Sequence, residues 1–262
     1  MAQALSEPGL MAEERRRRIC ELLRSEGRVR VEALATRFGT STVTIRADLS
    51  SLEAAGALTR THGGALNVPE ADQPLSVKEL QHRAEKLRIA EAAAALIRDG
   101  ETLILDSGTT TAEIARRIRA LPLRAVNVIT NALNIAALLI DVPSVRLIMP
   151  GGILRRDSNS LSGPMAEAAL ATLTASRLYL GADGIDPQIG IMTPHVAEAE
   201  LNAKMIAMSA QVVVVADSSK FARRNISLIA RIEQVHMLIT DRAAPAEAVE
   251  QLRVRGVAVR LV

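Results

Sequence analysis

Apolar residues recur at helical spacing in three short segments near the N-terminus. A first helix is predicted over roughly 12–25 and a second over 31–38, each ending at a glycine. Ser41 is a natural N-cap for a third helix that runs to about residue 55. The following segment, 57–67, is predicted to form two short strands around consecutive glycines. This part of the chain is therefore a small helical unit with a hairpin.

From about residue 82 the pattern changes to alternating helices and strongly apolar strands. A helix is predicted over 82–100. The strands that follow are predicted at 102–105, 125–129, 145–149, 177–181, 212–216, 236–240 and 257–261. Runs such as Val212–Val215 lack polar alternation, which is typical of strands covered on both faces. The intervening helices favour parallel pairing, so the fold class is α/β with a mostly parallel sheet.

The boundary between these two regions is a polar segment with two prolines and no apolar period. We expect an N-terminal domain over 1–66, a linker over 67–76 and a larger α/β domain over 77–262.

Composition narrows the possible functions. The chain has 262 residues, of which 48% are apolar and 23% charged, so a packed core is expected. Phe38, Tyr179 and Phe221 are its aromatic residues, which disfavours base stacking on single strands. The one cysteine excludes an internal disulfide, and the four histidines lack metal-ligand spacing, so no metal and no cofactor are expected.

The net charge of +3 is too small to indicate a nucleic-acid partner by itself. No apolar run reaches the length of about 18 residues that a membrane span requires. The N-terminus places its arginines after a mild stretch, unlike a secretory signal. We therefore expect a soluble, cytoplasmic protein.

The two short helices joined by a glycine-containing turn are typical of a helix-turn-helix, whose second helix enters the DNA major groove. Short hydroxyl side chains at its start and a following arginine suit phosphate and base contacts. An alternative is a small helical domain whose polar residues face water. The candidate DNA-binding residues are Arg17, Ser41, Thr42, Thr44, Arg46, Arg60 and His62.

Polar residues follow strand after strand in the larger domain, and ligands of such sheets bind at the carboxyl ends of the strands. Glycines, hydroxyls and a lysine can hold a phosphate at a helix N-terminus, while carboxylates accept bonds from sugar hydroxyls. A turn or cap role is the alternative for each residue taken alone. The candidate effector-binding residues are Asp106, Ser107, Gly108, Thr109, Thr110, Asn131, Gly151, Gly152, Arg155, Asp183, Gly184, Glu198, Asp217 and Lys220. Arg155 and Arg156 are expected on a flexible loop that closes over the anion.

The N-terminal motifs resemble the winged helix-turn-helix of DeoR-type transcriptional regulators. They include S-x-x-T-I-R at Ser41–Arg46 and R-x-H-G-G-A at Arg60–Ala65. The chain departs from the usual family pattern at Ala47, where a second arginine is common. Further motifs, among them L-D-S-G-T-T at 105–110 and A-D-S-S-K-F at 216–221, resemble the C-terminal domain of the same family. The resemblance spans essentially residues 12–262.

The resemblance implies a sensor domain similar to ribose-5-phosphate isomerase and sugar-phosphate deaminase. It also implies a repressor of a carbohydrate-utilisation operon that binds double-stranded operator DNA as a homo-oligomer, either dimer or tetramer. A phosphorylated sugar or amino sugar is the expected inducer. The alternative is a sugar-phosphate isomerase or deaminase with an accessory DNA-binding domain, for which Asp106, Asp183 and Glu198 are candidate bases by residue type. We expect a regulator without catalytic residues.

Overall fold

The computed structural model describes residues 7–67, 75–221 and 223–262. The chain divides into two compact units, Met1–Lys78 and Glu79–Val262. Most of the predicted linker, residues 68–74, lies outside the described residues. On either side of this gap, Asn67 is the last residue of strand β3 and Leu75 is the first residue of helix α4 (Leu75–Leu80).

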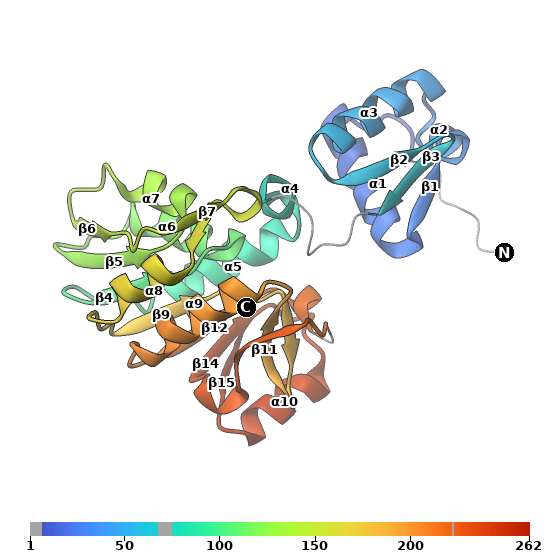
Figure 1. Cartoon of the computed structure of the whole chain (residues 1–262). Helices are drawn as coiled ribbons and strands as arrows, with labels where there is room; N and C mark the ends of the chain where they lie inside the picture. Colours follow the sequence, from blue (N-terminus) through green and yellow to red (C-terminus); the bar gives the residue numbers. More distant parts are fainter. Residues whose placement is uncertain (1–6, 68–74, 222) are drawn as a thin grey trace. The chain divides into compact units, whose positions relative to one another are not determined.

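The N-terminal unit is a winged helix-turn-helix (Figure 1). Its three-stranded antiparallel sheet has the order β1-β3-β2. The predicted helices and hairpin are confirmed, whereas the short strand β1 was not predicted. The elements are α1 (Ala12–Glu26), β1 (Arg28–Arg30), α2 (Val31–Phe38), α3 (Thr42–Ala54), β2 (Leu58–Thr61) and β3 (Gly64–Asn67).

The core of this unit forms where the three helices meet the inner face of the sheet. Ile19, Phe38, Ile45 and Leu49 are almost completely buried in it. Gly64 lets β3 lie tightly against β1, because a Cβ atom at this position would lie 1.9 Å from the carbonyl oxygen of Val29. Glycine is therefore required at the centre of the wing.

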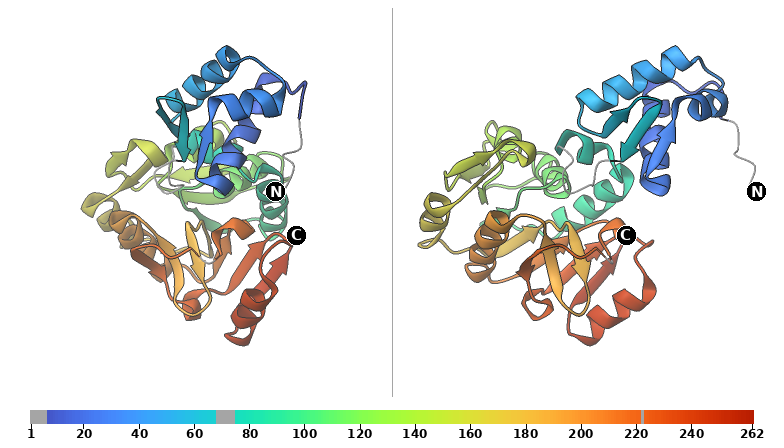
Figure 2. Two further views of the ribbon diagram at one scale, coloured as in Figure 1. Left: turned by 90° about the vertical axis from the view of Figure 1, so that its right-hand side faces the viewer. Right: turned by 45° about the vertical axis from the view of Figure 1, so that its right-hand side comes forward.

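The larger unit is built on a seven-stranded parallel sheet, which confirms the predicted α/β class (Figure 2). Its spatial order is β15-β14-β12-β9-β4-β5-β6. All neighbouring pairs in it are parallel. The strands are β4 (Thr102–Leu105), β5 (Val126–Thr130), β6 (Val145–Ile148), β9 (Arg177–Leu180), β12 (Val212–Val215), β14 (Met237–Thr240) and β15 (Ala258–Leu261).

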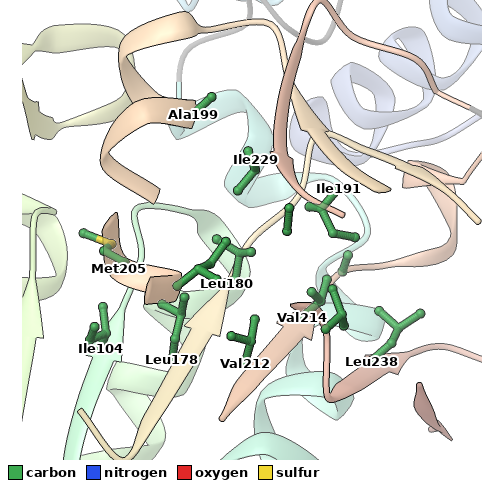
Figure 3. Packing of buried hydrophobic residues seen from close by; sticks show 14 of the residues in the cluster. Ile104, Leu178, Leu180, Ile191, Ala199, Met205, Val212, Val214, Ile229 and Leu238 are labelled. Carbon is green, nitrogen blue, oxygen red and sulfur yellow. The ribbon is translucent and has the colours of Figure 1, made fainter. Parts of the chain in front are cut away.

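Helices cover both faces of this sheet, and each face has its own apolar core. Figure 3 shows one of them, where Ile104, Leu178 and Val212 of neighbouring strands follow one another and Met205 lies near Ile104 and Leu178. One face packs against α5 (Arg83–Ala94), α6 (Thr109–Ile118) and α7 (Leu133–Leu139), and the other against α8 (Pro164–Leu170), α9 (Val196–Ala207) and α10 (Ala246–Val254). The helix predicted over 82–100 is shorter than expected, because tight turns follow Ala94.

Short antiparallel strands beside the main sheet were not predicted. One pair is β7 (Ile153–Arg155) with β8 (Ser160–Ser162), and a separate three-stranded sheet joins β10 (Gly184–Asp186), β11 (Gly190–Thr193) and β13 (Ser227–Ala230). The expectation of a flexible loop after Gly152 is wrong. Arg155 lies in β7 and Arg156 begins a 3₁₀ turn, η2 (Arg156–Ser158). Two further 3₁₀ turns are η3 (Ser218–Lys220) and η4 (Ile232–Gln234).

Candidate functional site

The exposed side of α3 is the centre of the DNA-binding candidate. Arg46, Ala47 and Ser50 are exposed on it, and Val43 is 71% exposed. The opposite side of the helix enters the core. No ion pair joins Arg46 to any described residue, so its guanidinium is available to a partner. Val43 was not among the predicted residues, although its spacing from Arg46 and Ala47 places it on their face.

The predicted hydroxyl residues lie at the start of this helix. Ser41 is the N-cap, as predicted, and its Oγ accepts a hydrogen bond of 3.1 Å from the Thr44 amide. The hydroxyls of Ser41 and Thr44 are also 2.9 Å apart. Thr42 and Thr44 are half-buried. Ser41 and Thr44 therefore shape the start of α3, which limits their freedom to contact bases.

The arginine run at the start of α1 is divided between two roles. The carboxylate of Asp48, a buried residue of α3, accepts hydrogen bonds from Arg15 Nε at 2.6 Å and from Arg16 Nε at 3.0 Å. Arg18 pairs with Glu7 and Glu21 of its own unit. Arg17 is exposed and forms no ion pair with the described part of the chain. Most of the run therefore stabilises the unit, whereas Arg17 remains a candidate for a phosphate.

The wing is tied to α3 by the predicted residue Arg60. Its Nη1 donates to Ser50 Oγ at 2.9 Å, and its amide donates to Glu53 Oε1 at 3.0 Å. His62 is exposed at the tip. Sequence reasoning missed Arg30, which pairs with Gly64 of the wing and helps to line a cavity of about 440 Å³. Its strand, β1, is too short for a periodic pattern to reveal.

In the larger unit, the predicted effector residues lie along one edge of the main sheet. The strands β14, β12, β9, β4, β5 and β6 are consecutive neighbours, and their carboxyl ends therefore form one contiguous row. The residues that follow them include Asp217, Asp183, Asp106, Asn131 and Gly151. The topology thus brings together side chains that are far apart in the sequence.

Asp106 is a buried ionisable group of this edge with a shifted pKa. The residue is 1% exposed. Its Oδ1 accepts a hydrogen bond of 2.6 Å from the Ser107 amide, and its Oδ2 accepts one of 3.3 Å from the Gly181 amide. Burial, followed by the negative charges of Glu198 and Asp183, raises the pKa of Asp106 well above its ordinary value. The two amides oppose this increase but do not cancel it. Its protonated form therefore persists to higher pH than that of an ordinary aspartate, and in that form the carboxyl group can donate a hydrogen bond.

The other two carboxylates of the cluster are held in one network. Thr193 Oγ1 lies 3.2 Å from Asp183 Oδ2 and 3.3 Å from Glu198 Oε1. Arg155 Nη1 donates to Glu198 Oε2 at 3.2 Å, and its other terminal nitrogen contacts His195. Thr193 was missed because it lies on β11, a strand that the sequence pattern does not predict.

A second group of residues suits an anion. Gly108 is the N-cap of α6, Ser107 precedes it, and Thr109 and Thr110 begin the first helical turn, whose amides lack intrahelical acceptors. Lys220 is half-buried in η3, beyond the end of β12. This group and the carboxylate cluster lie on the same sheet edge, so they can bind the two ends of a polar ligand.

Some predicted residues have clear structural roles. Asp217 Oδ1 accepts the Ser219 amide at 3.1 Å and caps η3. Gly184 lies so close to the Arg223 carbonyl oxygen that a Cβ atom would be 2.3 Å from it. Gly152 has φ +115° and would place a Cβ atom 2.6 Å from the Ser162 carbonyl oxygen. Gly151 also has a positive φ, of +74°.

Buried polar atoms at the same edge have no hydrogen-bond partner among the described residues. They are Asn131 Oδ1, Ser219 Oγ and Thr240 Oγ1. Asn131 uses its amide nitrogen to donate to the Leu161 carbonyl at 3.1 Å, which leaves its oxygen available. Because an unmet buried polar group is costly, these atoms favour a polar ligand at the strand ends.

Within the described residues, no cluster of three or more histidine, cysteine or acidic side chains is arranged to hold a metal ion. None of the helices in the described ranges has the length and apolarity that crossing a bilayer requires.

The two units together define a DNA-binding transcriptional regulator, with a winged helix-turn-helix joined to a sensor domain. Residues 15–70 match the family model for the DeoR-like helix-turn-helix domain, and residues 81–242 match that for the DeoR C-terminal sensor domain. The chain belongs to the DeoR family of transcriptional regulators. Both models describe parts of regulators, so the alternative of a metabolic enzyme is not supported.

The chain matches proteins that are named as transcriptional regulators, and each match covers nearly the full length of both proteins. The "Putative aga operon transcriptional repressor" of Escherichia coli O157:H7 is 42% identical, covering 95% of this chain and 93% of that protein. The "HTH-type transcriptional regulator GlpR" of Haloferax volcanii is 35% identical, covering 95% and 98%. Among solved structures, ribose 5-phosphate isomerase A of Methanocaldococcus jannaschii aligns with a TM-score of 0.41 and 17% sequence identity. The alignment covers 54% of this chain and 56% of the isomerase chain. Such a score carries no information on function.

Proposed function

We propose that this regulator represses a carbohydrate-utilisation operon and that a phosphorylated sugar or amino sugar releases it from operator DNA. The observation that carries the proposal is the sheet edge that combines the N-terminus of α6, whose amides suit an anion, with a cluster of three carboxyl groups. The name of one relative, a repressor of the aga operon, supports a role in operon control.

The phosphate end of such a ligand fits the start of α6. The amides of Thr109 and Thr110 lie in the first turn, where the helix dipole favours negative charge. Ser107 adds a hydroxyl, and Lys220 adds a cation from η3. Together these groups provide the charge-assisted hydrogen bonds that phosphate oxygens form with proteins.

The other end of the ligand fits the carboxyl groups. Asp183 and Glu198 accept hydrogen bonds from hydroxyl groups, as they do from Thr193, and Asp106 donates to an oxygen when it is protonated, a form that its raised pKa favours. Arg155 pairs with Glu198, and the charges of Glu198 and Asp183 are close enough to Asp106 to raise its pKa. The carboxylates of Asp183 and Glu198 would attract an ammonium group, which is why an amino sugar remains within the proposed class.

Release requires that the ligand bind more tightly to a state that fits the operator poorly. A coupling free energy of about 1–3 kcal/mol is sufficient for such control. We propose that the protein acts as a homo-oligomer, dimer or tetramer, with its recognition helices in half-sites about 34 Å apart or a multiple of that distance. Residues 67–76 and the helix that follows connect the reader to the sensor and are the proposed transmission element.

The test is calorimetry of the full chain against a panel of sugar phosphates and amino-sugar phosphates. Lys220→Ala should weaken binding of the active compound by about 10- to 100-fold, the value of a hydrogen bond to a charged group, and leave operator affinity unchanged. Lys204→Ala is the matched control, because Lys204 is exposed near the opposite end of α9 from Glu198. Absence of heat with every compound, or equal losses in both variants, would contradict the proposal.

A further inference from the structure

The exposed face of α3 carries an apolar pair that the fold does not use. Val43 is 71% exposed, and Ala47 is exposed one turn later on the same face. The helix contributes Ile45 and Leu49 to the core instead. A β-branched residue lowers helix propensity, so Val43 stabilises neither the core nor the helix. The pair is therefore available for a contact outside the unit.

The surroundings of the pair match a DNA groove. Arg46 is exposed between the two residues along the helix, and Ser50 continues the same face by one more turn. Arg60 of the wing is bonded to Ser50 and adds a second cation beside the face. An apolar centre flanked by cations and a hydroxyl is complementary to base edges bordered by phosphates.

Thymine supplies the apolar group that such a pair would meet. In the major groove its 5-methyl group distinguishes it from every other base, and small apolar side chains contact it directly. Residues in the first turns of a recognition helix are those that reach base edges. Val43 and Ala47 occupy such turns of α3, which begins at Thr42.

We propose that Val43 and Ala47 read thymine 5-methyl groups in the major groove, so that the operator half-site carries thymine where this pair docks. The inference rests on the DNA-binding role of the N-terminal domain and is independent of the effector. The short side chain of Ala47 lets the valine methyl groups approach the bases closely. Arg46 then provides the polar contact beside them.

The test removes the methyl group from the DNA alone. Duplexes are selected from a random pool with the full chain, and each thymine of the selected half-site is replaced in turn by deoxyuridine, which lacks only the 5-methyl group. Fluorescence anisotropy at fixed salt gives the Kd of each duplex. At one or more positions the replacement should weaken wild-type binding by about fourfold, the value of one buried methyl group.

Val43→Ala should lose this response, binding the thymine and deoxyuridine duplexes equally at that position. Val254→Ala is the matched control, because Val254 is 79% exposed on α10 and should leave the response intact. The proposal fails if the selected half-site has no thymine, if no replacement changes the Kd, or if Val43→Ala keeps the wild-type response. Failure to bind any duplex would instead contradict the DNA-binding role itself.

Discussion

Asp48 is expected to hold the recognition helix in place, and Asp48→Ala is the sharpest test of how the N-terminal unit is stabilised. Its side chain is 3% exposed and forms an ion pair with Arg15, whose side chain is 11% exposed. Removing one partner of a buried ion pair costs about 3–5 kcal/mol, because the other charge stays buried and unpaired. Arg15 keeps a 3.0 Å bond to the Leu10 carbonyl, so we expect a loss near the lower limit, about 3 kcal/mol.

Such a loss is large for a small unit. At roughly 0.05–0.15 kcal/mol per residue, about 60 residues yield a total stability of only 3–9 kcal/mol. Arg16→Ala is the matched control. Arg16 binds the same carboxylate with a side chain that is 39% exposed, so its removal should cost less than about 1 kcal/mol.

Hydrogen-exchange mass spectrometry on the full chain measures this difference, because peptides from α1 and α3 report the opening free energy of their own unit. Asp48→Ala should lower protection in both helices and weaken DNA binding in parallel, with exchange in the sheet of the larger unit unchanged. Equal protection in Asp48→Ala and the wild type would refute the assignment of a buried, stabilising ion pair.

Three further changes are predicted from single contacts. Gly64→Ala should destabilise the N-terminal unit by about 1–3 kcal/mol or more, because the added Cβ atom overpacks the wing. Gly63→Ala is the control, because a Cβ atom at that position has open space and should not destabilise the unit. Thermal unfolding measures the difference. Asp106→Asn should become more stable relative to the wild type as pH rises above about 4. The raised pKa keeps the Asp106 carboxyl group protonated in the folded protein at pH values where it ionises in the unfolded chain. The free energy of unfolding of the wild type therefore falls with rising pH, whereas the asparagine of the variant does not titrate. A parallel pH dependence of the two melting temperatures would contradict this. Arg46→Ala should cost roughly 1–3 kcal/mol of operator affinity, and an unchanged Kd would remove Arg46 from the DNA contacts.

The main elements of both units could be predicted from the sequence because their signals are local. Ser41 caps a helix whose apolar positions repeat at helical spacing, and the run Val212–Val215 is buried along its whole length. The short strands could not be predicted in this way. β1 has three residues and pairs with β3, which is distant in the chain. β11 has only two large apolar residues, Ile191 and Met192, and so lacks the longer apolar run that marks the strands of the main sheet.

The candidate sites were predictable to a similar extent. Asp106 and Asn131 follow strong strands, so the parallel topology is sufficient to place them side by side. Thr193 could not be found, because its position between two carboxylates depends on β11. The role of Asp48 could not be found either, since a charged residue on the buried side of a helix is explained only by its arginine partners.

The central claim is that one ligand-binding edge controls one DNA-binding face, and reciprocal binding tests it most directly. The Kd of the active sugar phosphate is measured by calorimetry with the free protein and with the protein saturated by its operator duplex. Because coupling is reciprocal, the duplex should weaken ligand binding by the same factor, about 5- to 150-fold, by which the ligand weakens duplex binding. Identical ligand affinities with and without operator DNA would contradict the account.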